Sequence, residues 1–254
     1  MWSFENGPKL KIIHTGQRPI YGVAFSPDGR SIIVAPSDSQ VTRWSLENDT
    51  HQRVARLVLV GLRDCIGTSQ VGVLTNTQDW IWNGQQVRPI GEQSTFRHAM
   101  ICSLDGAWFA EGFTDGNVRL RSTLTGWSFT VIEAGEAIRW ISMSPDNAEV
   151  AVTIKNQLII RSRSEAYPQT APLRIRVVGA HYVTHSADGK WLVTQCDNGD
   201  VWFYRRSDGH WLYRSVGAAA SQPGSFSADS THFVATDDSG GVFVFDVTAS
   251  SFRL

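Results

Sequence analysis

The chain has 254 residues, of which 42% are hydrophobic and 11% aromatic, with ten Trp and 22 Gly. This composition can bury a large core in one all-β domain that has many tight turns. Charged residues make up only 19% and the net charge is −1, which argues against nucleic acid or an anionic membrane as the main partner, because both need a basic excess.

The N-terminal residues 1–7 lack the basic start and apolar run of a signal peptide. No apolar run approaches the roughly 18 residues that a membrane helix needs. The three cysteines, Cys65, Cys102 and Cys196, stand alone in strand-like segments, and we expect them to be reduced, buried thiols. These features predict a cytoplasmic protein.

A short turn motif recurs along the chain. It is first seen as Ser26-Pro27-Asp28-Gly29, and related copies begin at Ser103, Ser144, Ser186 and Ser227, the last four being 41, 42 and 41 residues apart. Ser and Asp can bond their own backbone, Pro presets φ, and Gly accepts positive φ, so each copy predicts a tight turn between strands. The gap of 77 residues after the first copy leaves room for one more.

Runs rich in Val, Ile, Phe and Trp surround these turns and predict short strands. In chain order the strands are residues 20–25, 31–36, 41–46 and 53–60, then 63–66, 71–75, 80–82 and 86–90, then 98–102, 108–113, 117–121 and 128–132, then 139–143, 149–154, 158–162 and 173–178, then 182–185, 191–195, 201–204 and 211–215, and finally 224–226, 232–236 and 242–247.

Four strands in about 41 residues describe one blade of a β-propeller. The pattern resembles WD40 repeats, whose consensus has Ser-Pro-Asp-Gly between the first two strands, and the strongest matches are residues 23–29 with Trp44, and Phe245-Asp246. Most copies lack the Trp-Asp dipeptide, and the family's buried His–Ser–Asp–Trp network cannot form in full. The resemblance implies a degenerate WD40 array of the kind common in bacterial proteins.

We predict a single all-β domain over residues 1–254, a six-bladed propeller with four antiparallel strands per blade. The repeats cover roughly residues 17–60, 61–94, 95–134, 135–178, 179–216 and 217–254. The sixth copy has three clear strands, and residues 9–14 read as a strand that precedes the first copy. Because an open ring would leave sheet edges unpaired, residues 1–14 are predicted to supply the closing strand of the last blade.

No catalytic, metal or cofactor site is predicted. His181 and His185 are four residues apart in a strand, so their Cβ atoms lie about 13 Å apart, too far to share a metal ion. His185 aligns with inward packing positions. The loop residues Asp115, Asp197 and Asp237 are explained by tight turns alone. No Gly-x-Ser-x-Gly elbow is present.

Two surfaces are candidates for partner binding. The first is the channel-mouth face, where the first strands of the blades begin; aromatic and Arg side chains there are typical of interface hot spots. Its residues are Tyr21, His98, Arg139, Trp140, His181, Tyr182 and Gln222. The second is a rim patch on third and fourth strands, which would suit an acidic partner or only keep sheet edges apart. Its residues are Arg119, Arg121, Arg161, Arg163, Arg174, Arg176, Arg205 and Arg206.

The predicted function is a non-catalytic platform for protein–protein interaction, a scaffold or sensor propeller that acts within a larger assembly or derives from a multidomain signalling protein. The propeller is expected to be monomeric or a module of a larger complex. Two alternatives stay open. A small-ligand sensor would bind in the central channel. A propeller hydrolase or lactonase would need carboxylate or His groups at the channel mouth, and the aligned positions there hold no carboxylate.

Overall fold

The structure is a computed structural model that describes residues 20–25, 30–36, 40–48, 50–56, 59–64, 71–75, 80–82, 87–89, 97–103, 105–163, 171–217 and 220–248. Within these ranges, side chains are described for residues 30–34, 41–48 and 50–53 and from residue 99 onward. Residues 220 and 221 are described by their backbone alone. The regular secondary structure of these residues consists of strands joined by turns. Within the same ranges there is no helix with the length and hydropathy of a membrane span.

The described strands form six antiparallel sheets. Sheet 1 has β1 (Ile20–Phe25), β2 (Ser31–Pro36), β3 (Gln40–Ser45) and β4 (His51–Arg56); sheet 2 has β5 (Leu59–Asp64), β6 (Val71–Thr75), β7 (Trp80–Trp82) and β8 (Val87–Pro89). Sheet 3 has β9 (Arg97–Cys102), β10 (Trp108–Phe113), β11 (Asn117–Ser122) and β12 (Ser128–Glu133); sheet 4 has β13 (Trp140–Met143), β14 (Glu149–Ile154), β15 (Gln157–Ser162) and β16 (Leu173–Arg176). Sheet 5 has β17 (Ala180–His185), β18 (Trp191–Cys196), β19 (Asp200–Arg205) and β20 (His210–Ser215); sheet 6 has β21 (Ala220–Phe226), β22 (His232–Asp237) and β23 (Val242–Asp246).

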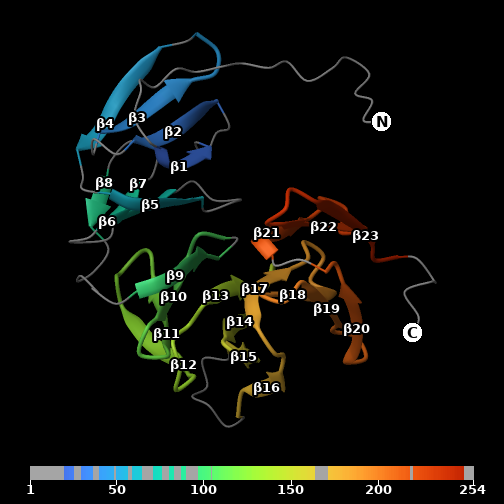
Figure 1. Cartoon of the computed structure of the whole chain (residues 1–254). Helices are drawn as coiled ribbons and strands as arrows, with labels where there is room; N and C mark the ends of the chain where they lie inside the picture. The colour runs from blue at the N-terminus through green and yellow to red at the C-terminus, as the bar shows by residue number, and fades with distance from the viewer. Residues whose placement is uncertain are drawn as a thin grey trace.

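Each sheet is a meander in which successive strands pair. The first strands of neighbouring sheets contact one another in the order β1, β5, β9, β13, β17 and β21. Figure 1 shows these first strands nearest the centre and the fourth strands outermost. The predicted all-β, six-bladed arrangement is therefore confirmed, while the predicted closing strand at residues 1–14 lies outside the described residues.

The start of the second sheet was predicted wrongly. The sequence predicts a strand over residues 53–60 and the next over 63–66, whereas β4 ends at Arg56 and β5 begins at Leu59. Residues 57–60 read Leu-Val-Leu-Val, a continuous apolar run without a turn residue, so neither a period-2 pattern nor a turn signal marks the boundary. Sheet 2 thus begins two residues before the predicted repeat boundary at residue 61.

The repeated Ser-x-Asp motif forms the turn between first and second strands, as predicted, in the four copies that the structure describes. In the copy of sheet 4, Ser144 Oγ donates to Asp146 Oδ1 at 2.6 Å and accepts from the N–H of Glu149 at 2.9 Å. The positive-φ positions are Gly106, Asn147, Gly189 and Ser230. In sheet 6, hydrogen bonds from Ser227 and Thr231 lower the pKa of Asp229 to about 2. The motif is structural.

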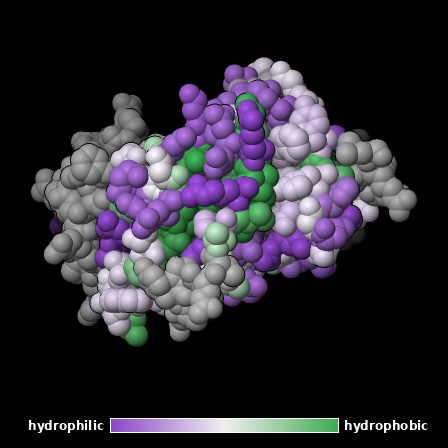
Figure 2. Space-filling model, turned by 90° about the horizontal axis from the view of Figure 1, so that it is seen from below, coloured by the Kyte–Doolittle hydropathy of each residue, from purple (hydrophilic) through white to green (hydrophobic). Residues whose placement is uncertain are grey.

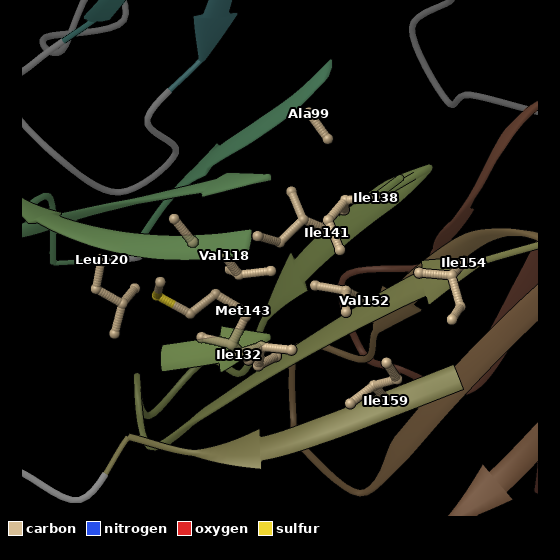
Figure 3. Packing of buried hydrophobic residues seen from close by; sticks show 12 residues of the cluster. Ala99, Val118, Leu120, Ile132, Ile138, Ile141, Met143, Val152, Ile154 and Ile159 are labelled. Carbon is tan, nitrogen blue, oxygen red and sulfur yellow. The ribbon is translucent and has the colours of Figure 1, made fainter. Parts of the chain in front are cut away.

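The core consists of side chains packed between neighbouring sheets. Between sheets 3 and 4, Val118 and Leu120 of β11 pack with Ile141 of β13 and Val152 of β14 (Figure 3). Similar clusters join sheets 4 and 5, and sheets 5 and 6. Figure 2 shows the face seen from below, where hydrophilic residues cover most of the described surface and hydrophobic ones are visible between them. Burial of apolar side chains between neighbouring sheets therefore stabilises sheets 3 to 6.

The cysteines do not all behave as predicted. Cys196 is a free, buried thiol, and burial raises its pKa to about 12. Cys102 is disulfide-bonded, so the expectation of reduced thiols is wrong at this position. Disulfides persist mainly in oxidising compartments. The cytoplasmic location therefore stays a prediction without the support of the cysteines.

Candidate functional site

The first strands share a register irregularity close to their starts. In β1, β5, β9, β17 and β21 one residue near the start of the strand has no partner on the second strand, as in a β-bulge. These unpaired residues are Tyr21, Val60, His98, His181 and Ser221. Bulges re-aim a side chain away from the regular pleat and are frequent beside functional sites. The irregularity therefore marks one end of every described first strand except β13.

Three of the residues predicted for this end, Tyr21, His98 and His181, occupy the bulge positions of their strands. Gln222 lies one residue beyond the bulge of β21 and is exposed. The sequence does not predict Val60 at this end, because the predicted start of sheet 2 lies after the observed one. For Tyr21, Val60 and His98 the structure describes the backbone but not the side chain.

Arg139 and Trp140 come from the start of sheet 4 and meet the start of sheet 5. Arg139 precedes β13, and its N–H donates to the carbonyl of Thr153. Its Nη1 donates to Asp197 Oδ2 at 2.5 Å and to the Ala180 carbonyl at 3.2 Å. The ring of Trp140 meets the ring of Tyr182 edge-on, with centroids 5.0 Å apart. The contact between two sheets thus brings predicted residues together.

Asp197 completes this group. His181 Nδ1 lies 2.6 Å from Asp197 Oδ1, and the imidazole stacks on Tyr182 at 4.2 Å between centroids. We call Arg139, Trp140, His181, Tyr182 and Asp197 the strand-start cluster. Since an ionised carboxylate only accepts, Nδ1 carries the proton in this pair, and Nε2 of a neutral His181 is left as an acceptor.

The electrostatics of the cluster keep Asp197 charged. Partial burial works against its ionisation, but hydrogen bonds from Arg139 and His181 outweigh burial and hold the pKa of Asp197 below its usual value. The pKa of Tyr182 is raised mainly by burial and to a lesser extent by the negative charge of Asp197. The side chains of Arg139, His181 and Asp197 are 28%, 36% and 47% exposed, so the cluster is ordered by internal contacts and still open to a partner.

Asp197 corrects the prediction that tight turns explain the loop aspartates. Asp115 and Asp237 do close their own turns, accepting from the N–H groups of Asn117 and Ser239. Asp197 instead bonds side chains from two different sheets. No local sequence signal distinguishes the three, because the partners of Asp197 are 58 and 16 residues away along the chain.

The rim arginines of sheet 3 are engaged within the fold. Arg121 is buried and donates from Nε to Glu111 Oε2 at 3.0 Å. The guanidinium of Arg119 lies 4.9 Å from the centroid of the Phe113 ring. Neither side chain resembles the solvated edge charge that alternation along a strand predicts.

The other rim arginines divide into engaged and exposed ones. Arg163 lies over the Trp108 ring at 5.0 Å, and Arg174 donates to the Glu133 carbonyl at 2.8 Å. Arg176 is exposed, and Arg161 is half-buried. Arg205 pairs with Asp208 at 2.8 Å, and Arg206 with Glu149 at 2.9 Å. The arginines therefore do not form one continuous free patch.

Comparison with known proteins agrees with the fold. The family model described as "WD domain, G-beta repeat" matches residues 8–45. The structure is similar to the β-propeller domain of Cps50 (Swd1) from Myceliophteria thermophila, with a TM-score of 0.66 and 13% identity over 90% of this chain and 83% of that one. No curated protein matches the sequence. The chain contains a WD40 repeat and has the fold of a WD40 β-propeller.

Proposed function

We propose that this chain is a non-catalytic platform for protein–protein interaction and that its partner docks on the strand-start cluster. WD40 propellers are commonly interaction scaffolds, which makes this class the first to consider. The partner is a protein, and the chain works as a scaffold or sensor, alone or within a larger signalling assembly. The rim arginines are a weaker second surface, because most of them already have partners inside the fold.

One observation carries the proposal: side chains typical of binding hot spots are gathered where two sheets meet and are held there by internal bonds. Aromatic and Arg side chains dominate the energy of most interfaces. In the strand-start cluster, Trp140 and Tyr182 are partly exposed, and Asp197 fixes the orientations of Arg139 and His181. A preorganised surface loses little side-chain entropy on binding, which favours affinity.

The structure adds one feature that a hydrolase would need, a carboxylate beside a histidine. Asp197 lies next to His181, although the aligned strand-start positions themselves contain no carboxylate. Both oxygens of Asp197 are already bonded, Oδ2 to Arg139 and Oδ1 to His181. Within the described ranges, no hydroxyl or thiol is hydrogen-bonded to the imidazole of His181; the Thr153 hydroxyl donates only to the backbone carbonyl of His181. No three His, Cys, Asp or Glu side chains in these ranges are grouped to hold a metal ion. The His181–Asp197 pair therefore favours recognition over nucleophilic catalysis.

The proposal is tested with the double variant His181→Ala/Tyr182→Ala. Its partly exposed rings should be removable without unfolding, so its melting temperature should stay close to that of the parent while capture of partner proteins from the native lysate falls at least tenfold. Trp127→Ala is the matched control, since it removes a 60% exposed aromatic ring from the turn end of sheet 3. Normal capture by the double variant, together with loss in Trp127→Ala, would move the binding surface to the turn end.

A further inference from the structure

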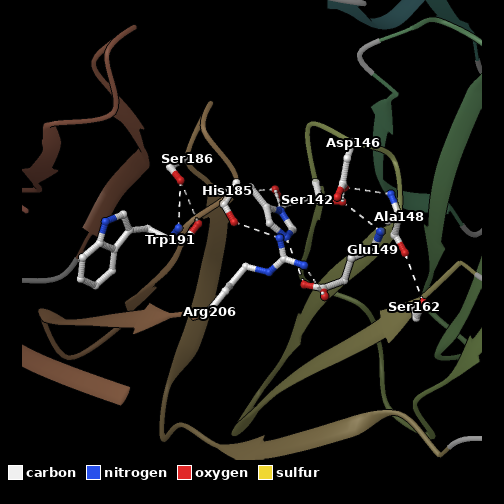
Figure 4. Close-up of polar contacts among 11 residues, drawn as sticks. Ser142, Asp146, Ala148, Glu149, Ser162, His185, Ser186, Trp191 and Arg206 are labelled. Carbon is white, nitrogen blue, oxygen red and sulfur yellow. Dashed lines mark hydrogen bonds and ion pairs between the residues drawn. The ribbon is translucent and has the colours of Figure 1, made fainter. Parts of the chain in front are cut away.

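A second polar group joins sheets 4 and 5 at the opposite end of their inner strands. It contains Ser142 of β13, Glu149 of β14, His185 of β17 and Arg206, which follows β19 (Figure 4). The side chain of His185 is only 2% exposed and that of Glu149 17%. Four polar side chains from two sheets thus meet at the interface, where His185 is almost fully buried and Glu149 and Arg206 are partly exposed.

The hydrogen bonds to Ser142 determine which ring nitrogen of His185 carries the proton. Ser142 Oγ accepts the backbone N–H of His185 at 3.1 Å, and it lies 2.8 Å from Nδ1. No other acceptor for this hydroxyl is found in the part of the chain that the structure describes. The hydroxyl therefore donates to Nδ1, and Nε2 carries the proton of the neutral imidazole.

On its other side His185 faces a carboxylate that a second cation already uses. His185 Nε2 lies 3.5 Å from Glu149 Oε1, and Arg206 Nη2 lies 2.9 Å from Glu149 Oε2. Arg206 Nη1 also donates to the Gly189 carbonyl at 2.9 Å. Glu149 Oε1 and His185 Nε2 are buried without a hydrogen bond, so the contact between them is close but incomplete. The resting state is a neutral imidazole beside a matched Glu–Arg pair.

Protonation of His185 would disturb this arrangement in two ways. Nδ1 would become a donor, so the Ser142 hydroxyl would lose its acceptor inside the interface. The buried His185 cation and the half-buried Arg206 would then share Glu149. Asp146 is the other charged group, among the described residues, that acts on His185. Burying a second positive charge costs free energy unless it is paired.

The direction of the pH effect follows from these contacts. Burial, opposed in part by Glu149, lowers the pKa of His185 below its usual value. A depressed pKa in the folded state means that stability is complete above the pKa of the unfolded chain, about 6.5, and falls as the pH drops below it. The pKa of Glu149 is also lowered, against its own burial, by His185 and Arg206, so its contribution is lost only at more acidic pH.

A groove gives solvent a route to this group. It has a volume of about 540 Å³ and lies between the outer parts of sheets 4 and 5, with Glu149, Arg206, Ile160 and Tyr204 in its lining. Protons can therefore exchange with the Glu149–Arg206 pair without separation of the whole sheet interface.

We propose that His185 makes the contact between sheets 4 and 5 a proton-sensitive joint, which is tight at neutral pH and loosens in mild acid. β13 and β17 carry this joint at one end and the strand-start cluster at the other. A looser joint would shift Arg139 and Trp140 relative to His181 and Tyr182. This second step, acid control of partner binding, rests on the proposed function, whereas the joint itself does not.

The joint is tested on the full chain by comparing the parent with His185→Gln, in which an amide can still bond Ser142 but cannot become charged. The melting temperature of the parent should fall by about 3 °C or more from pH 7.5 to 5.5. The fall in His185→Gln should be at most half as large. His210→Gln, which changes an exposed histidine of β20, should behave as the parent does. Equal acid sensitivity of His185→Gln and the parent would overturn the proposal.

A second measurement covers the case in which His185→Gln does not fold. Hydrogen exchange of the parent at pH 5.5 should be faster, after correction for intrinsic rates, in β13 and β17 than in β10 and β11. Uniform protection across sheets 3 to 5 would also overturn the joint. Partner capture at pH 7.5 and 5.5 separates the proton-sensitive joint from acid control of partner binding. If acid weakens capture by the parent but not by His185→Gln, His185 controls partner binding. If acid weakens capture equally in both, this control is refuted while the joint itself stands.

Discussion

The charged side chains show how far burial changes the role of a residue. Arg121 looks like an edge charge in the sequence, yet it lies under the β11–β12 turn and bonds Glu111 Oε2 and the carbonyl of Gly126. Glu111 is 1% exposed. A buried ion pair adds little net stability, but removal of one partner leaves an uncompensated charge.

The variant Glu111→Ala should therefore be strongly destabilised, because Arg121 would stay buried without its carboxylate. We expect the free energy of unfolding to fall by about 3–5 kcal/mol, as measured by denaturant titration. Glu136→Ala, which changes an exposed loop residue of the same charge, is the control and should change it by less than about 0.5 kcal/mol. A similar small loss in both variants would show that Arg121 finds water or another partner.

At the scale of elements, β21 is the least regular of the described first strands. Its register with β22 shifts twice, between Ala220 and Gln222 and between Gln222 and Ser225. Sheet 5 holds the irregular segment: Gln195 accepts from the N–H of Gly224, and Thr184 donates to its carbonyl. A fully buried Gln thus replaces the ladder bonds that the irregular strand cannot make.

Gly224 is required for this close approach. A Cβ at this position would collide with the ring of Phe233 and lie 2.5 Å from the carbonyl oxygen of Val234. We expect Gly224→Ala to lower the free energy of unfolding by about 1–3 kcal/mol, because rigid backbone and a packed ring must move. The control is Ser225→Ala at an exposed neighbour, and denaturant titration of both variants measures the difference. A tolerated Gly224→Ala would mean that β21 can shift as a unit.

In the whole molecule, sheet 6 is the sheet whose last described strand, β23, has apolar side chains that no other described residue covers. Val242 and Val244 of β23 are 66% and 52% exposed. The equivalent residues of β19, matched through their partners on the second strand, are Val201 and Phe203, which are 2% and 0% exposed. β19 has a fourth strand and a neighbouring sheet beside it, so exposure of β23 indicates that this end of the ring requires a further covering segment.

We propose that residues 9–14 cover this end as the fourth strand of sheet 6, and the WD40 match, which begins at residue 8, supports this. Deletion of residues 1–14 should then lower the melting temperature by about 10 °C or more, since it would remove a strand and expose core. Deletion of residues 1–6 alone is the control and should have little effect. Equal melting temperatures for the parent and the longer deletion would refute closure by this segment.

Local sequence patterns are sufficient to predict the architecture. Turn residues and period-2 alternation act over a few neighbouring positions, so the Ser-x-Asp turns, most strands of sheets 3 to 6 and the end of the molecule where first strands begin could be predicted. The start of β21 could not, since it lies at Ala220 and the predicted strand begins at residue 224. The boundary between β4 and β5 could not be predicted, because residues 57–60 form a continuous apolar run without a turn residue.

Which of these residues act together depends on contacts between strands and sheets that local patterns do not reveal. Asp197 joins Arg139 and His181, Glu111 neutralises Arg121, and His185 meets Glu149, in each case through register and contact between strands or sheets. These pairs are 10 to 58 residues apart along the chain. Local propensity carries no information on such contacts, since they depend on how neighbouring sheets pack and on the burial that follows.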